Sequence, residues 1–301
     1  MSWIFYALGA RFLWAWTNIG DKFLLTNKVK DPYVYLAISF FVDIVAIPLW
    51  LFFGLHWYGW SVLFLMLLDA VLFFSGGFFY ILSAQREEIS RVNLLWNLSP
   101  LQGLWLSWLI LGETLQTVQL LALAILLTGS IFAGLHLGSK NGNFKLSKGF
   151  WFMIVSTLLF AGGDIITHHL VVSGIPALQL AGYQLCLLPI LSLTMCLFKG
   201  FRQRLSIEKK NYSIKVIMFL IGMALFSRIG VLFNMKALGM GHISLINVLE
   251  GAQTIMVFVL AILLTFFAPK YIKEEWDKKN LLLKLVALIL MVVGIVVLNV
   301  K

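Results

Sequence analysis

Long apolar segments, separated by short polar connections, recur along the whole 301-residue chain. Each segment is about 20 residues long, which is the length that an α-helix needs to cross roughly 30 Å of hydrocarbon. The segments lie at 3–25, 33–54, 61–84, 90–111, 115–137, 149–171, 177–198, 214–237, 244–267 and 281–299. The pattern therefore predicts an all-α integral membrane protein with ten transmembrane helices.

The composition agrees with a membrane protein and argues against a soluble one. Hydrophobic residues make up 61% of the chain and charged residues 12%, whereas about 25% of the residues in an ordinary soluble domain are charged. The net charge of +10 comes from Lys and Arg in the connections, where basic residues mark the cytoplasmic side of a membrane. We therefore expect a lipid bilayer around the chain and no nucleic-acid partner.

The two halves of the chain resemble each other. The run Ile89–Leu95 is similar to Ile243–Leu249, and the same register continues backward without a gap. The other matched positions are Gly76 with Gly230, Phe79 with Phe233, Trp14 with Phe160, and the late glycines Gly129 and Gly294. Several matches in one order indicate a duplication, which is common in transporters. We expect one five-helix repeat at 1–138, a linker at 139–148 and a second five-helix repeat at 149–301.

The basic residues predict that the two repeats are inverted. An odd number of spans makes the second repeat cross in the opposite sense, and the connection after span two (56–60) has no Lys or Arg, whereas its counterpart at 199–215 is strongly basic. Of the 23 Lys and Arg, 18 lie in or beside the connections after odd-numbered spans. The positive-inside bias then places these connections in the cytoplasm and both termini outside the cell membrane.

Three motifs of the first half carry a family resemblance. They are Ser90-Arg91-Val92-Asn93-Leu94-Leu95, Ser99-Pro100 and Leu111-Gly112-Glu113-Thr114-Leu115. In these runs the sequence resembles the ten-span EamA-like members of the drug/metabolite transporter superfamily. The second half is a weaker copy, with Gln253-Thr254 at the position of Ser99-Pro100. The resemblance implies inverted five-helix repeats around a central cavity and transport by alternating access, without naming a substrate.

Polar side chains on spans four and nine are the first candidates for substrate binding. Asn93, Trp96 and Asn97 share one helical face, and span nine presents Asn247 and Glu250 at the matching positions. Such residues can also serve only as interhelical hydrogen-bond partners. Glu250 is the leading candidate, because a carboxylate is costly inside a membrane. Burial favours its protonated form, which makes proton coupling accessible near neutral pH.

Other spans carry further candidates. Trp14 and Asn18 of span one match Phe160 and Asp164 of span six, while Asp21 approaches the membrane interface. Arg228 needs an anionic partner in a membrane, and we expect Glu250, Asp164 or a substrate carboxylate. Asp43 and Gln184 each precede a proline by five residues and are placed in the cavity wall. The candidate residues are Glu250, Asp164, Arg228, Asn93, Trp96, Asn97, Asn247, Asn18, Trp14, Asp43, Tyr183 and Gln184.

These features favour a secondary transporter that exports a small, polar, amine-bearing metabolite and is open to proton coupling. The chain has no phosphate-binding loop of the Gly-x-x-x-x-Gly-Lys-Ser/Thr type. The adjacent His168 and His169 point about 100° apart on a helix, so we expect neither metal nor cofactor and no enzyme activity. The alternatives are a membrane-embedded scaffold or receptor, and uptake of sugar-type or nucleotide-type metabolites. The protein is expected to be a monomer or a homodimer.

Overall fold

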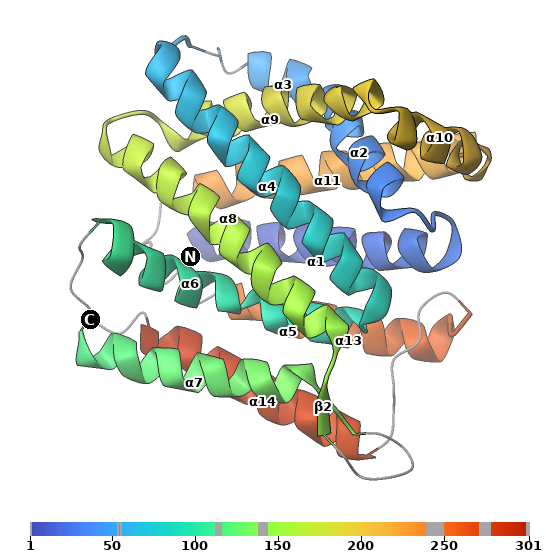
Figure 1. The fold of residues 1–301 in the computed structure, drawn as a ribbon. Coiled ribbons are helices and arrows are strands. Elements are labelled where there is room, and N and C mark those ends of the chain that lie inside the picture. The colour runs from blue at the N-terminus through green and yellow to red at the C-terminus, as the bar shows by residue number, and fades with distance from the viewer. Residues whose placement is uncertain are drawn as a thin grey trace.

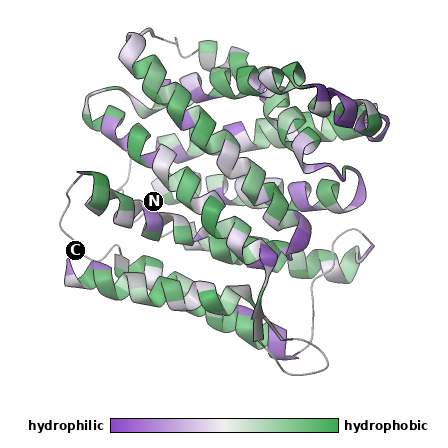
Figure 2. Cartoon of the chain, in the orientation of Figure 1, coloured by the Kyte–Doolittle hydropathy of each residue, from purple (hydrophilic) through white to green (hydrophobic). Residues whose placement is uncertain are grey.

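The protein is a bundle of α-helices (Figure 1). The computed structural model describes residues 2–52, 54, 56–111, 116–137, 144–238, 250–270 and 278–298. Hydrophobic residues cover most of the helices, and hydrophilic residues gather on the short helix α10 and at helix ends (Figure 2). This distribution is that of helices whose outer faces are solvated by lipid.

The first half runs from α1 to a small β-ribbon. Its helices are α1 (Ser2–Asn27), α2 (Pro32–Val42), the 3₁₀-helix η1 (Asp43–Ala46), α3 (Ile47–Leu51), α4 (Trp60–Arg86), α5 (Ile89–Trp96), α6 (Leu98–Leu106), the π-helix η2 (Ser107–Leu111) and α7 (Thr117–Gly134). Two antiparallel strands follow, β1 (Leu135–Leu137) and β2 (Phe144–Leu146), with Leu135 opposite Leu146. This ribbon leads into the second half.

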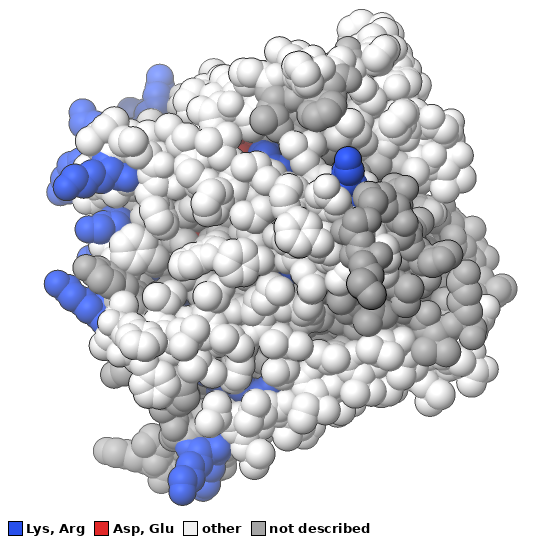
Figure 3. Space-filling view, turned by 180° about the vertical axis from the view of Figure 1, so that it is seen from behind, with Lys and Arg blue, Asp and Glu red and all other residues white. Residues whose placement is uncertain are grey.

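The second half consists of helices throughout its described part. They are α8 (Lys148–Val172), α9 (Ala177–Thr194), η3 (Met195–Leu197), α10 (Lys199–Glu208), η4 (Lys209–Asn211), α11 (Ile214–Leu238), α13 (Glu250–Phe267) and α14 (Lys278–Leu298). In Figure 1, α1 begins and α14 ends on the left, while α10 lies at the right. Seen from behind, Lys and Arg gather along the edge of the molecule where α10 lies (Figure 3).

The prediction of a helical membrane protein is confirmed, whereas the number of ten spans stays a prediction. Each predicted segment coincides with one or more helices. Within the described residues, five helical stretches are long and apolar enough to cross a membrane by themselves: α4, α8, α9 with η3, α11 and α14. The apolar stretches of α2 with η1, of α7 and of α13 are shorter.

Two predicted spans are broken in the middle, which the sequence reasoning missed. Span two changes to a 3₁₀-helix at Asp43, and span four breaks at Asn97 between α5 and α6. A proline follows each break, and Pro48 and Pro100 cannot donate the backbone hydrogen bond to the carbonyl four residues earlier. That carbonyl belongs to Ile44 in η1 in one case and to the last residue of α5 in the other. The α-helix therefore stops at these points.

The basic connection after span seven contains a helix that the sequence reasoning did not predict. In α10 (Lys199–Glu208), Phe201 is buried against Val34 of α2, and the other residues are mostly polar. Arg204 donates to Asp31 at 2.9 Å, and this hydrogen bond raises the pKa of the Arg204 guanidinium. Because Asp31 also caps the N-terminus of α2, α10 is fixed to the start of that helix.

The packing of the helices follows one pattern in both halves. Helix α4 of the first half packs on α8 of the second half. The corresponding pair, obtained by exchanging the halves, is α11 of the second half on α1 of the first, and these two helices are packed as well. Likewise α6 contacts α8 as its counterpart α13 contacts α1, and α7 and α2 contact their own counterparts, α14 and α9. Exchanging the halves therefore maps these main helix pairs onto one another.

Candidate functional site

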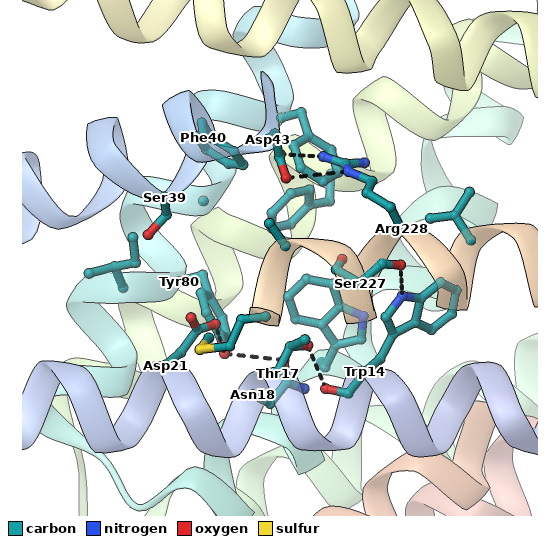
Figure 4. A pocket seen from close by; sticks show the side chains of 18 of the residues that line it. Trp14, Thr17, Asn18, Asp21, Ser39, Phe40, Asp43, Tyr80, Ser227 and Arg228 are labelled. Atoms are coloured by element: carbon teal, nitrogen blue, oxygen red, sulfur yellow. Dashed lines mark hydrogen bonds and ion pairs between the residues drawn. The ribbon is translucent and has the colours of Figure 1, made fainter. Parts of the chain in front are cut away.

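A cavity of about 480 Å³ lies inside the bundle, mainly among α1, α2, α4, α5 and α11 (Figure 4). Its polar lining consists of Arg11, Thr17, Asn18, Asp21, Tyr35, Ser39, Asp43, Tyr80, Asn93, Asn97, Gln184, Ser227, Arg228, Asn234, Gln253 and Thr254. Aromatic rings complete the wall, among them Trp14, Trp96 and Phe160. A cavity of this size with a few convergent polar groups is typical of a small-molecule site.

An ion pair between Arg228 and Asp43 forms one end of the polar lining. Both residues are buried, with 8% and 6% of their surface exposed. Asp43 Oδ2 accepts from Arg228 Nη2, and Oδ1 lies 3.4 Å from Nε (Figure 4). Asp43 is thus a partner of Arg228. The sequence reasoning placed Asp43 in the cavity wall but did not propose it as the anionic partner of Arg228. Of the two acids that it did choose, Asp164 lies outside the lining, and the side chain of Glu250 is outside the described part of the chain.

Asp21 of α1 is a second acid in the cavity lining, separate from the Arg228–Asp43 ion pair. Its Oδ1 accepts from the Tyr35 hydroxyl at 2.6 Å, and its Oδ2 lies 3.4 Å from the Tyr80 hydroxyl. The sequence reasoning placed Asp21 near the membrane interface and did not count it among the binding candidates, whereas Tyr35 of α2 and Tyr80 of α4 hold it in the cavity lining. The neighbouring Lys22 donates to the backbone oxygens of Ala84 and Glu87.

The polar faces of spans four and nine meet at the cavity, beside the break in span four. Asn97 Nδ2 donates to the Thr254 hydroxyl of α13 at 3.1 Å. The same hydroxyl lies 3.3 Å from the Asn93 carbonyl oxygen, and Asn93 Oδ1 accepts from Asn18 of α1 at 2.7 Å. Three helices are joined by these bonds. The predicted Asn247 is outside the described residues.

Two tryptophans that the sequence singled out form aromatic walls. Trp14 Nε1 donates to the Ser227 carbonyl oxygen at 3.1 Å, and the Arg11 guanidinium lies 5.0 Å from the centre of the Trp14 ring. Trp96 packs edge-on against Tyr80, with ring centres 5.7 Å apart, and lies 5.0 Å from the Phe160 ring. Such rings can hold a cationic or apolar part of a ligand.

The remaining sequence candidates lie at different distances from the cavity. Gln184 lines it and donates to Asp69 Oδ2 at 3.0 Å. Tyr183 does not line it, because its hydroxyl donates to the His56 carbonyl oxygen at 2.9 Å and so fastens the connection after span two. Asp164 is exposed on α8 and is not part of the cavity lining.

A buried charged cluster lies outside the cavity, where α5 meets α7 and α14. Glu88 Oε2 is 2.9 Å from Arg91 Nε and 2.8 Å from Lys284 Nζ. Arg91 also donates to the backbone oxygens of Ala133 in α7 and Leu135 in β1, and to Asn280 of α14. Arg91 is fully buried and Lys284 nearly so. The cluster joins three helices, and we assign it a structural role.

Comparison with known proteins supports a transporter. Residues 1–135 match the EamA-like transporter family. A solved crystal structure is similar over 96% of this chain and 94% of its own, with a TM-score of 0.55 and 19% identity, which shows the fold alone. No curated protein sequence matches. EamA-like transporters are generally not enzymes. This match over the first half is consistent with the drug/metabolite transporter superfamily, which the sequence motifs resemble.

Proposed function

We propose that the protein is a secondary transporter of a small, polar, amine-bearing metabolite, which it binds in the cavity beside α1. The observation that carries the proposal is a cavity of about 480 Å³ with charged and amide side chains inside a bundle of apolar helices. Polar groups in such a place are costly and normally mark a substrate pathway. Among the described lining atoms, Asn234 Oδ1 is buried without a hydrogen-bond partner, as expected of a group that awaits a polar ligand.

The charges of the cavity favour a zwitterion. Its described lining contains two arginines, Arg11 and Arg228, and two aspartates, Asp21 and Asp43. If all four are ionised, the formal charges cancel, so a ligand with a net charge gains little from the cavity as a whole. A zwitterion gains at both ends, because each of its charged groups can lie near a fixed charge of opposite sign. Nucleotides and other polyanions fit this lining poorly.

Transport by alternating access is supported by the packing of the two halves, whose main helix contacts map onto one another when the halves are exchanged. We propose that residues 1–138 and 149–301 are inverted repeats, joined by the linker 139–148, and that they rock against each other around the cavity. The broken helices at Asp43 and Asn97 lie at its wall, and discontinuous helices are common at transporter binding sites.

The orientation follows from the charges of the connections. We propose that the edge rich in Lys and Arg (Figure 3) is cytoplasmic and that both termini lie outside. We expect a C-terminal alkaline phosphatase fusion to be active and a C-terminal fluorescent-protein fusion, which matures in the cytoplasm, to stay dark. The opposite pattern would reverse the proposed orientation.

The test of transport uses purified full-length protein in liposomes. We expect an imposed proton gradient to drive flux of an amine-bearing metabolite from a panel of amino acids, amines, sugars and nucleotides. Ala224→Phe adds a ring to the cavity wall and should abolish this flux, whereas Ile190→Phe, at an exposed position of α9, should keep it. If Glu250 is the coupling acid, Glu250→Gln keeps substrate exchange and loses the dependence on the proton gradient.

Several outcomes would contradict the proposal. Flux of sugars or nucleotides alone would replace the substrate class by the alternative one. Equal flux in Ala224→Phe and the unaltered protein would exclude the cavity as the pathway. If the folded protein moves no member of the panel, the transport proposal loses its support and a scaffold or receptor role gains it.

A further inference from the structure

We infer that the cavity binds an elongated zwitterion, whose ammonium group lies at Asp21 and whose carboxylate lies at Arg228. The inference deepens the proposed function and rests on it. It commits to a substrate in which the amine and the carboxylate are several bonds apart, unlike those of an α-amino acid. Three observations carry it. They are the orientations of the hydrogen bonds near Asp21, the N–H donors of Arg228 that Asp43 does not use, and the separation of these two sites along α1 and α2.

The orientations of the amides near Asp21 can be worked out from their partners. Asn93 Nδ2 donates to the Ile89 carbonyl oxygen at 3.1 Å, and a carbonyl can only accept. Asn93 Oδ1 must therefore accept from Asn18 Nδ2, at 2.7 Å. This turns Asn18 Oδ1 toward Tyr80, whose hydroxyl oxygen lies 3.4 Å from it and 3.4 Å from Asp21 Oδ2.

The region around the Tyr80 hydroxyl thus has more acceptors than donors. Asn18 Oδ1, Asp21 Oδ2 and the Tyr80 oxygen all accept hydrogen bonds, and among the described residues only the Tyr80 hydroxyl supplies a proton to share among them. The 3.4 Å separations are long for O–H···O hydrogen bonds. An ammonium group offers three donors and a positive charge. It therefore supplies what these three oxygens lack, and the nearby Trp96 ring adds an aromatic face.

The Arg228 end offers donors in place of acceptors. Asp43 uses Nε and Nη2 of the guanidinium. Nη1 has no hydrogen bond to any residue that the structure describes, and its N–H groups can bind a carboxylate. Asp43 fixes the orientation of the guanidinium, so the loss of side-chain entropy on binding a ligand is small.

The two sites lie on the order of 10 Å apart. Trp14 bonds to Ser227, next to Arg228, and Asp21 follows Trp14 by seven residues of α1, or about 10 Å at 1.5 Å per residue. On α2, Tyr35 bonds to Asp21 and precedes Asp43 by eight residues, or about 12 Å. Figure 4 shows the Arg228–Asp43 pair above Asp21. The ammonium and carboxylate of an α-amino acid, joined through one carbon, cannot reach both sites.

The test compares two isomers that differ only in the position of the amine. Isothermal titration calorimetry on the purified full-length protein measures the Kd of 6-aminohexanoate and 2-aminohexanoate, with hexylamine and hexanoate as single-charge references. We expect 6-aminohexanoate to bind at least about tenfold more tightly than its isomer, since it makes one more charge-assisted contact. Hexylamine and hexanoate should each bind more weakly than 6-aminohexanoate.

Two variants assign the two ends, and a third serves as a control. Asp21→Asn should weaken binding of 6-aminohexanoate and hexylamine about tenfold or more and leave hexanoate unchanged. Arg228→Lys should weaken 6-aminohexanoate and hexanoate and leave hexylamine unchanged. Asp69→Asn removes another buried carboxylate, which lies outside the lining and accepts a hydrogen bond from the lining residue Gln184. It keeps an oxygen acceptor for Gln184 and should alter none of these values.

Equal or tighter binding of 2-aminohexanoate would overturn the inference, as would unchanged hexylamine binding in Asp21→Asn. If Asp21→Asn does not fold, the isomer pair on the unaltered protein still decides. If none of the four ligands binds, the elongated zwitterion is excluded. The flux panel in liposomes then decides the proposed function separately, because transport of another amine-bearing metabolite would leave that function standing.

Discussion

The interface between α1 and α11 and the interface between α4 and α8 place a glycine against an aromatic ring at matched positions. A Cβ on Gly230 would lie 2.7 Å from Trp14 Nε1, and a Cβ on Gly76 would lie 3.2 Å from Phe160 Cε2. A second ring contact is repeated as well. The Phe233 ring is 5.4 Å from that of Tyr6, and the matching Phe79 ring is 6.2 Å from that of Phe152.

The residues beside these shared contacts differ between the two interfaces. In the register that pairs Gly230 with Gly76, Ser227 corresponds to Phe73 and Arg228 to Phe74. Trp14 accordingly donates a hydrogen bond to Ser227, whereas the Phe160 ring packs on the Phe73 ring at 4.7 Å. Among the described lining residues, α1 supplies five and α8 supplies Phe160 alone.

The comparison shows that the close packing of two helices does not determine which polar groups lie beside them. Both interfaces share the packing, and one of them carries the polar residues of the site. Both interfaces place a glycine where two helices approach closely, because a Cβ there would crowd an aromatic ring, more severely at Gly230 than at Gly76. The polar groups have no such requirement, and they are concentrated on the α1–α11 side. If the halves arose by duplication, as we propose, the polar lining has since diverged between the two copies.

The largest expected difference comes from replacing Arg228 and its counterpart Phe74, each in a separate variant, by methionine. Arg228→Met leaves Asp43 buried without its cation, and we expect a loss of about 3–5 kcal/mol in stability together with loss of substrate binding. Phe74→Met keeps an apolar side chain at a partly buried position and should cost less than about 1.5 kcal/mol. Unfolding of both variants in matched detergent, followed by tryptophan fluorescence, checks the difference.

The double variant Asp43→Asn/Arg228→Met separates stability from binding. Because it leaves no buried charge unpaired, we expect stability to return to within about 1 kcal/mol of the unaltered protein, as buried ion pairs contribute little net stability. Substrate binding should stay lost. Recovery of binding in the double variant would show that the ion pair is structural only.

An intermediate effect is expected from filling the two matched glycines. Gly230→Ala places a methyl group 2.7 Å from the Trp14 indole nitrogen, so the ring must shift and lose its bond to Ser227. We expect a loss of about 1–3 kcal/mol and weaker substrate binding. Gly76→Ala meets Phe160 and the Ser156 carbonyl oxygen at 3.2 Å, which demands a smaller shift and should leave binding unchanged. Thermal melting and calorimetric titration measure both variants.

The smallest effect is expected from making the two aromatic positions alike. Trp14→Phe removes the hydrogen bond to Ser227 and keeps a ring against Gly230, so the α1–α11 interface comes to resemble the α4–α8 interface. We expect a loss of about 0.5–1.5 kcal/mol, the usual contribution of one hydrogen bond. A loss of several kcal/mol would show that the indole contributes packing that a phenyl ring cannot replace.

The sequence by itself determined the class of the protein, the positions of its apolar helices and the family of its first half. These properties depend on local quantities, namely the length and hydropathy of each segment and short motifs such as Ser90–Leu95. Helical periodicity also predicted that Asn93, Trp96 and Asn97 share a face, and all three line the cavity. The matched glycines followed from comparing the halves, without any knowledge of the fold.

Only the tertiary structure decided which charged groups meet. Arg228 and Asp43 are 185 positions apart in sequence, and whether they touch depends on how α11 crosses the broken end of α2. Asp21 became part of the site because Tyr35 and Tyr80 reach it from two other helices. Hydropathy places a residue along the membrane normal but contains no information on which helix lies beside it. Partners in a bundle are fixed by the crossing of helices, and therefore the sequence pattern alone did not identify Asp43 as a partner of Arg228.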